Sequence, residues 1–182
     1  MKKETILLVV VTLVVGCLGG MIFSNVSKKS SPAKPVATSA PAIDFQQKIK
    51  VLKEVVGREP ENRNAWVQLG HNLFDSGQQM GAIEAYDKAL ELDGNDPNVL
   101  TDQGIMYRQV GWFDKAVNNF VKANKLNPNH PQSLFNLGLV YRDDLQDLPK
   151  AKLAWTRYLE IVPTGASADN VRVMLDHLAT GH

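Results

Sequence analysis

The chain has 182 residues, of which 44% are hydrophobic and 21% are charged, so its length allows one modest domain and an additional segment. From residue 43 onward, 15 Lys and Arg residues stand against 18 Asp and Glu residues, and no basic stripe is present. The resulting negative balance excludes nucleic acid as a partner.

An uninterrupted apolar segment begins the chain. Residues 6–23 comprise 18 residues without a charge. A helix of this length spans about 27 Å, close to the roughly 30 Å of a bilayer core. The segment therefore predicts contact with a membrane through residues 6–23 and a transmembrane signal anchor over residues 1–26. The sequence ending at Cys17 also resembles a bacterial lipobox, so a lipoprotein anchored at Cys17 is an alternative, and a cleaved signal peptide is a third interpretation.

The orientation of this segment is weakly encoded, because lysines flank both of its ends. A short N-terminal tail before an export-like apolar run nevertheless favours a single-pass protein whose folded domain lies outside the cytoplasm, in the periplasm. Residues 27–42 follow with three prolines, four serines, four alanines and no periodic apolar face. This composition predicts an extended linker that holds the domain away from the membrane.

Helical periodicity starts at Ile43. Asp44 can cap a helix over residues 43–58, whose apolar residues recur at three- and four-residue spacing. Gly57 and Pro60 end this helix. We interpret it as a degenerate half-repeat that caps an array of repeats.

A pattern with a period of 34 residues then occupies residues 63–96, 97–130 and 131–165. Small residues coincide in all three units, and they are Gly70, Gly104 and Gly138 in the first half and Ala82, Ala116 and Ala151 in the second. Large residues that can fill the space between units are Trp66, Tyr86, Phe120 and Trp155. The third unit has one extra residue in its inter-helix turn, between Asp143 and Pro149.

These residues resemble the tetratricopeptide repeat family, whose unit is a helix-turn-helix of 34 residues. The resemblance implies an all-α fold, in which a right-handed superhelix of repeats over residues 43–182 follows the N-terminal transmembrane helix. An amphipathic helix over residues 167–179 is predicted to cap the last repeat.

No catalytic or metal-binding pattern is present in the sequence. The four histidines are scattered, the glycines of the repeats occur singly, and the only cysteine lies in the apolar segment. We interpret His71 and Asp75, four residues apart, as a hydrogen-bonded pair on a helix surface. The acidic cluster Asp143, Asp144 and Asp147 lacks the spacing of a calcium loop and is interpreted as solvated. We therefore predict a protein that is not an enzyme and needs no cofactor.

The resemblance also predicts a binding surface. In the family, the first helix of each repeat lines a concave surface, chiefly through its second, fifth, ninth and twelfth residues. The corresponding residues here are Asn64, Val67, His71, Phe74, Asn98, Thr101, Ile105, Arg108, Gln132, Phe135, Leu139 and Arg142. An apolar strip flanked by asparagines and two arginines predicts a groove for a peptide or helix, with the arginines available for carboxylates. Coverage of the strip by a helix of this protein is the alternative.

Some family members clamp the C-terminal carboxylate of chaperones, but the clamp positions here hold Val67, His71, Ile105, Gln132 and Asn136. We therefore expect a membrane-tethered adaptor for another protein or peptide partner in the bacterial envelope. The layout also resembles membrane-anchored repeat proteins of cytochrome c maturation, which implies a chaperone for an exported substrate. A self-associating scaffold, paired through Gly16 and Gly20 or through its terminal repeats, is a further alternative.

Overall fold

The computed structural model describes residues 44–180, which are entirely helical apart from their connections and contain no strand. The predicted anchor and linker, residues 1–26 and 27–42, lie outside the described residues. Within residues 44–180, no helix is both long and apolar enough to cross a membrane. The elements are α2 (Phe45–Arg58), α3 (Arg63–Asp75), α4 (Gln79–Leu92), α5 (Pro97–Gln109), α6 (Phe113–Leu126), α7 (Pro131–Leu139), the π-helical turn η1 (Val140–Asp144), α8 (Leu148–Ile161) and α9 (Ala166–Thr180).

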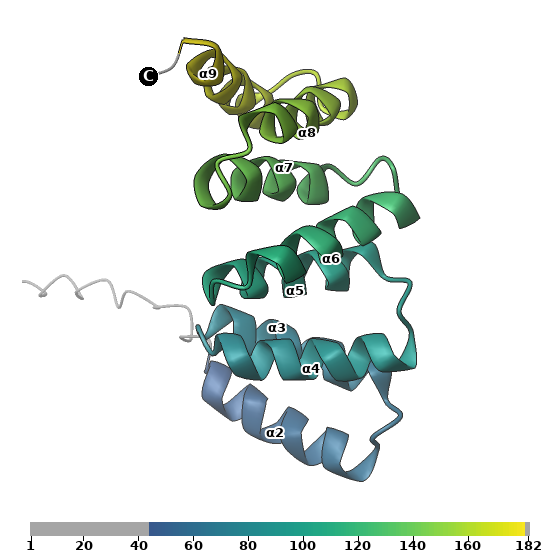
Figure 1. The fold of residues 1–182 in the computed structure, drawn as a ribbon. Helices are drawn as coiled ribbons and strands as arrows, with labels where there is room; N and C mark the ends of the chain where they lie inside the picture. The colour runs from purple at the N-terminus through teal and green to yellow at the C-terminus, as the bar shows by residue number, and fades with distance from the viewer. Residues whose placement is uncertain (1–43, 181–182) are drawn as a thin grey trace, which may run out of the picture. The chain divides into compact units, whose positions relative to one another are not determined.

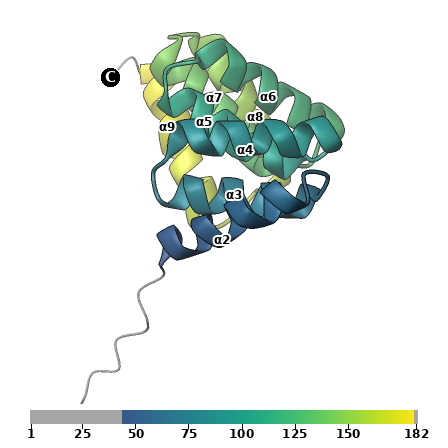
Figure 2. The same ribbon diagram turned by 90° about the horizontal axis from the view of Figure 1, so that it is seen from below.

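The helices pack in chain order, each against the next, from α2 to α9 (Figure 1). Figure 2 shows the same neighbours from below, with α2 beside α3. The connections between the helices are short, and most helices begin at a polar cap. Side chains of Asp44, Asn62, Asp96, His130 and Asp147 accept hydrogen bonds from backbone N–H groups of the first turn, which otherwise lack partners.

In each repeat, a glycine of the first helix lies against an aromatic ring of the second helix. A Cβ atom added to Gly70 would lie 2.4 Å from the Tyr86 ring, and one added to Gly104 would lie 2.5 Å from the Phe120 ring. At Gly138 the corresponding distance to Nε1 of Trp155 is 2.0 Å. The three aromatic rings are completely buried. The repeat glycines therefore allow the two helices of each repeat to pack closely.

The extra residue of the third unit is accommodated by a π-helical turn at the end of its first helix. Here α7 continues into η1, and the N–H of Leu145 donates to the carbonyl of Val140, five residues earlier, at 3.0 Å. The chain then turns at Gln146, whose φ is 55°. Gly77 and Gly111 occupy the same place in the other two turns, with φ of 71° and 79°. The third unit thus keeps the turn geometry but lacks the glycine that favours it.

We expect Gln146→Gly to stabilise the domain by about 0.5–1 kcal/mol, because glycine adopts a positive φ without the Cβ clash of other residues. The change also removes the hydrogen bond from Nε2 of Gln146 to the Asp143 carbonyl, but this bond is exposed. Thermal unfolding followed by circular dichroism measures the difference. Gly111→Gln is the reciprocal control and should destabilise by a similar amount. An unchanged or lower melting temperature for Gln146→Gly would contradict the prediction.

The last helix covers the third repeat. Ala168 and Val171 of α9 are completely buried, and Val171 packs in one cluster with Leu134, Trp155 and Tyr158. The opposite face of α9, with Asp169, is exposed. This helix therefore closes the apolar end of the array with a polar outer surface.

Candidate functional site

The twelve residues predicted to bind a partner lie along α3, α5, α7 and η1, and we refer to the surface that they mark as the first-helix face. Four of them are exposed, namely Asn64, His71, Asn98 and Gln132. Seven are half-buried, namely Val67, Phe74, Ile105, Arg108, Phe135, Leu139 and Arg142. The five apolar members of this second group pack against the core clusters, so each offers only part of its side chain to a partner.

Thr101 does not belong to this surface. Its side chain is 1% exposed, and Oγ1 donates to the carbonyl of Pro97 at 2.7 Å. The buried His130 lies beside it, 6% exposed, and uses Nδ1 to accept the N–H of Ser133 at 3.3 Å. Nε2 of His130 therefore carries the hydrogen and donates to Oδ1 of Asn98 at 3.0 Å. The side-chain oxygen of Asn98 is thus already hydrogen-bonded at the contact between the second and third repeats.

The two arginines are paired within the protein. Nη2 of Arg108 lies 3.1 Å from Oδ2 of Asp143, and Nε of Arg108 donates to Asp144. Arg142 donates to Asp143 and lies with its guanidinium 5.0 Å from the centre of the Trp155 ring. Both arginines are therefore paired with acidic residues of the same chain, where Asp143 is exposed and Asp144 is half-buried. Their use for a partner's carboxylate stays a prediction.

The pKa of Asp143 reflects this pairing. Its hydrogen bond from Arg142 lowers the pKa, burial opposes that effect, and the charges of Arg142 and Arg108 lower it further. The π-helical turn explains why the sequence pattern missed the cluster, since it places Arg142, Asp143 and Asp144 outside the regular helical spacing. The cluster joins α5 to η1 and is a contact between repeats.

A polar pocket lies at the junction of the first two repeats. It has a volume of about 260 Å³ and is lined by His71, Phe74, Asp75, Tyr86 and Asp102. Nε2 of His71 lies 3.2 Å from Oδ2 of Asp102, so the histidine pairs with the next repeat instead of with Asp75 on its own helix. The ring of His71 meets the Tyr86 ring edge-on, with 5.8 Å between the ring centres.

The side chain of Tyr86, which lines this pocket, carries a hydroxyl group. Tyr86 is completely buried, and its hydroxyl has no hydrogen-bond partner among the described residues. Burial raises the pKa of Tyr86, and the charges of Asp102 and Asp75 add to that increase, so the hydroxyl stays protonated. Leaving such a group without a partner costs about 1–3 kcal/mol. The accessible polar groups of the pocket are His71 and the carboxylates of Asp75 and Asp102, so the pocket suits a hydrogen-bond donor such as an amide or an ammonium.

The packing of the repeats does not require this hydroxyl. The equivalent residues are Phe120, which has no polar group, and Trp155, whose Nε1 donates to the carbonyl of Phe135 at 3.1 Å. Sequence reasoning assigned Tyr86 to packing alone and did not consider Asp102. The signal was present in the sequence, since Tyr86 is the one aromatic of the three that carries a hydroxyl.

The pair of His71 and Asp102 predicts a pH dependence of stability. The hydrogen bond to Asp102 raises the pKa of His71, burial opposes this, and nearby carboxylates add to the increase. A raised folded-state pKa stabilises the fold below the unfolded value of about 6.5, and this contribution is lost as the pH rises through the folded value. Both side chains are well exposed, so we expect a contribution of about 0.5 kcal/mol or less.

Urea unfolding of the wild type and His71→Gln at about pH 5.5 and pH 8 measures this effect, since histidine changes charge in that range. The variant should be less stable than the wild type by a larger margin at the lower pH. His130 acts in the opposite direction, because burial lowers its pKa, but it is present in both proteins and its effect cancels. An equal margin at the two pH values would contradict the prediction.

The described residues contain no group of three or more His, Cys, Asp or Glu side chains arranged to hold a metal ion. The polar pocket offers hydrogen-bonding groups, and the rest of the first-helix face offers half-buried apolar side chains with exposed amides at Asn64 and Gln132. Such a combination can hold a peptide backbone beside apolar side chains.

Two stretches, residues 64–96 and 98–130, match the family model described as tetratricopeptide repeat. These stretches coincide with the first two repeats. No curated protein sequence matches the chain.

Three solved structures illustrate the likeness of the fold. MamA is 24% identical with a TM-score of 0.68, and the alignment covers 75% of this chain and 84% of that one. A tetratricopeptide repeat protein from Parabacteroides merdae is 23% identical with a TM-score of 0.68, and the alignment covers 76% of this chain and 55% of that one. The first TPR domain of Spaghetti (RPAP3), bound to the HSP90 peptide SRMEEVD, is 26% identical with a TM-score of 0.56, covering 74% and 95%. Together with the family match, they support the tetratricopeptide repeat family and an all-α repeat fold.

Proposed function

We propose that this chain is a membrane-tethered adaptor that binds a peptide or a helix of a partner protein on its first-helix face. Tetratricopeptide repeat domains are typically protein interaction modules, and the related domain of Spaghetti binds a peptide. The observation that carries the proposal is the pocket on this face, where the exposed Asp75 and the half-buried Asp102 lie beside Phe74. A hydrogen-bond donor of the partner would bind to these carboxylates.

The mode of binding differs from capture of a chaperone tail. The acidic side chains of Asp75 and Asp102 border the pocket, and the pairing of Arg108 and Arg142 with Asp143 and Asp144 removes the obvious partners for a carboxylate. We therefore expect the partner to present an amide, a hydroxyl or an ammonium at the pocket and apolar side chains towards Ile105 and Phe135.

The experiment uses two exposed residues of this face whose replacement should not disturb the core. Asn64→Lys with Gln132→Lys places two long charged side chains along the first-helix face. Asn118→Lys with Asn170→Lys adds the same charge on α6 and α9, at exposed positions outside that face. Each chain is used to capture proteins from the membranes of its native cells, and the captured proteins are quantified by mass spectrometry.

We expect at least one protein captured by the wild type and by the control to fall about tenfold with the first pair, since few residues carry most of an interface's energy. Equal recovery of every captured protein by all three chains would show that the first-helix face is not the binding surface. Arg108 is not a suitable position for this test. Arg108→Glu would place a third carboxylate beside Asp143 and Asp144 and so disturb the fold.

The tether rests on the charge-free run of residues 6–23 and the proline-rich linker. We propose that this run anchors the domain on the periplasmic side of a bacterial membrane. Extraction of native membranes with alkaline carbonate tests the anchor, and the chain should stay with the lipid. The mass of the membrane-bound chain separates the two kinds of anchor, since a transmembrane helix keeps residues 1–16 whereas a lipoprotein begins at a lipidated Cys17.

A further inference from the structure

A series of hydrogen-bonded polar side chains connects the first two repeats. Oδ1 of Asp87 on α4 accepts a hydrogen bond from Nε2 of Gln103 on α5 at 2.7 Å. Oε1 of Gln103 in turn accepts from Nδ2 of Asn119 on α6 at 2.7 Å. The hydroxyl of Tyr107 donates to the same carboxylate at 3.4 Å, and this carboxylate and burial together raise the pKa of Tyr107 to about 12. These bonds link three successive helices across the junction.

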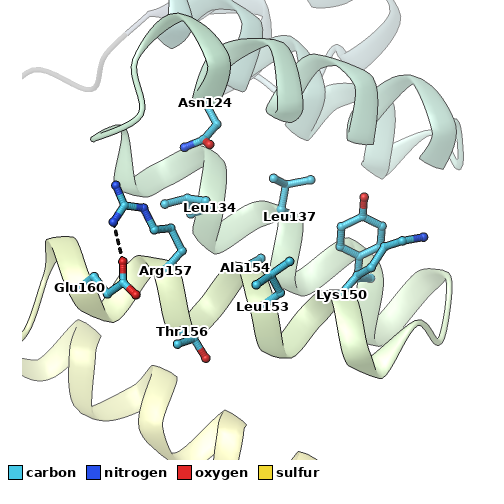
Figure 3. Close-up of a pocket in the computed structure, with 10 residues that line it drawn as sticks. Asn124, Leu134, Leu137, Lys150, Leu153, Ala154, Thr156, Arg157 and Glu160 are labelled. Atoms are coloured by element: carbon cyan, nitrogen blue, oxygen red, sulfur yellow. Dashed lines mark hydrogen bonds and ion pairs between the residues drawn. The ribbon is translucent and has the colours of Figure 1, made fainter.

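Of the equivalent positions between the second and third repeats, only that of Tyr107 keeps a polar group, the hydroxyl of Tyr141. Moving along the chain by one repeat replaces Asp87 by Val121, Gln103 by Leu137 and Asn119 by Ala154. The polar chain is therefore absent at this junction, and a hollow of about 480 Å³ occupies the region, lined by residues that include Leu134, Leu137 and Ala154 (Figure 3). This volume lies within the range of about 300–1,000 Å³ typical of pockets that bind ligands.

The hollow is separate from the first-helix face. Leu134, Leu137 and Tyr141 recur at three- and four-residue spacing, out of phase with Phe135 and Leu139, so the two sets lie on different sides of α7. One wall is α8, which contributes Leu153, an apolar side chain that is 72% exposed. An apolar floor with this exposed apolar side chain at its edge favours a large apolar group from outside.

The charges around the hollow contrast with the rest of the domain. Together α6 and α8 carry five lysines and one arginine against Asp114 and Glu160, whereas the described residues as a whole have three more acidic than basic side chains. At the rim, Arg157 pairs with Glu160 (Figure 3), and Lys150 pairs with Asp147 at 2.7 Å. The charged residues that line the hollow are Lys150, Arg157 and Glu160, which leave one positive charge in excess. Lys125 on α6 and Lys152 on α8 form no ion pair with any described residue and add positive charge on the same two helices, whereas Lys122 lies beside Gly94.

We infer that the hollow between α6, α7 and α8 binds an acidic segment of a partner protein, with one large apolar side chain seated on Leu134, Leu137 and Ala154. The carboxylates of the segment face the lysines of α6 and α8. Residues 2–42 of this chain do not fit, because they carry five lysines and a single glutamate. Self-pairing of two such basic surfaces is opposed by the same repulsion.

The test uses the full chain in nanodiscs of uncharged lipid and a fluorescent synthetic peptide with one central tryptophan among glutamates. Two further peptides replace the tryptophan by alanine or the glutamates by lysine, and empty nanodiscs serve as the blank. Fluorescence polarisation gives the affinities. The acidic tryptophan peptide should bind at least about tenfold more tightly than either of the others, because it alone offers both the anchor and the opposite charge.

Two variants assign that binding to the hollow. Val121→Asp with Leu137→Gln and Ala154→Asn rebuilds the polar chain of the preceding junction and should close the hollow, weakening binding about tenfold or more. Leu153→Glu changes an exposed side chain, so it should keep the fold and weaken binding of the acidic peptide by a similar factor. Val173→Glu on α9, where the valine is 52% exposed, is the matched control and should bind as the wild type does.

Three results would overturn the inference. The first is equal affinity of the wild type for the acidic and the basic tryptophan peptides. The second is equal affinity of Leu153→Glu and Val173→Glu for the acidic tryptophan peptide. The third is association of labelled and unlabelled full chains that Leu153→Glu abolishes, which would make the hollow a surface for a second copy. The first-helix face is untouched by these variants, so this inference and the proposed function fail or stand separately.

Discussion

Replacing Trp155 by alanine is expected to lower the free energy of unfolding by about 3–5 kcal/mol, the usual cost of truncating a large buried aromatic residue. Trp155 is completely buried, and it fills the space over Gly138 where α7 and α8 meet. Its Nε1 donates to the carbonyl of Phe135 at 3.1 Å, and Arg142 lies over its ring. The substitution leaves a cavity at the contact between the third repeat and α9, since Trp155 packs with Val171.

Chemical denaturation of Trp155→Ala, Trp155→Phe and Trp112→Ala measures this cost against two references. Phenylalanine serves at the same place in the second repeat, as Phe120, so Trp155→Phe should lose much less stability than the alanine variant. Trp112 is 39% exposed and should also be less costly to truncate. Equal losses for Trp155→Ala and Trp112→Ala would mean that Trp155 does not hold the third repeat together.

The second large effect is expected from a single added methyl group. Gly138→Ala should destabilise the domain by about 1–3 kcal/mol, as is typical of overpacking. The new Cβ would lie 2.0 Å from Nε1 of Trp155, and that buried ring is surrounded by α7, α8 and α9, so it has no open side to move into. Gly104→Leu should cost more, because its Cβ would already lie 2.5 Å from the Phe120 ring before the rest of the side chain is placed.

Gly57→Ala is the control for these two variants, because a Cβ at Gly57 meets no atom within 4 Å. Alanine is favoured over glycine in a helix by about 1 kcal/mol, so this change should leave stability equal or raise it. Differential scanning calorimetry of the three variants gives the comparison. A melting temperature of Gly138→Ala as high as that of Gly57→Ala would show that the junction of α7 and α8 is looser than the packing of Trp155 indicates.

The repeat pattern correctly assigns the twelve predicted binding residues to the first helices, but it does not tell which of their side chains are exposed. Counting residues from the start of each repeat places Asn64, His71 and Gln132 on exposed parts of the first helices. The same count cannot tell that Thr101 is buried beside His130, since that depends on how closely the next repeat approaches. It also cannot tell that Arg108 meets Asp143 and Asp144, residues 35 and 36 positions away that the π-helical turn brings into reach.

The sequence by itself determined the helices and the pairing within each repeat. The reason is that both depend on short separations, as with the caps at Asp44 and Asp96 and the packing of Phe120 on Gly104. The tertiary structure alone decided what happens between repeats. There, equivalent positions meet different neighbours, so Gln103 joins a chain of hydrogen bonds whereas Leu137 lines an open apolar hollow. Packing within a unit follows from the repeat pattern, but the chemistry of each junction follows from side chains that the pattern leaves free to vary.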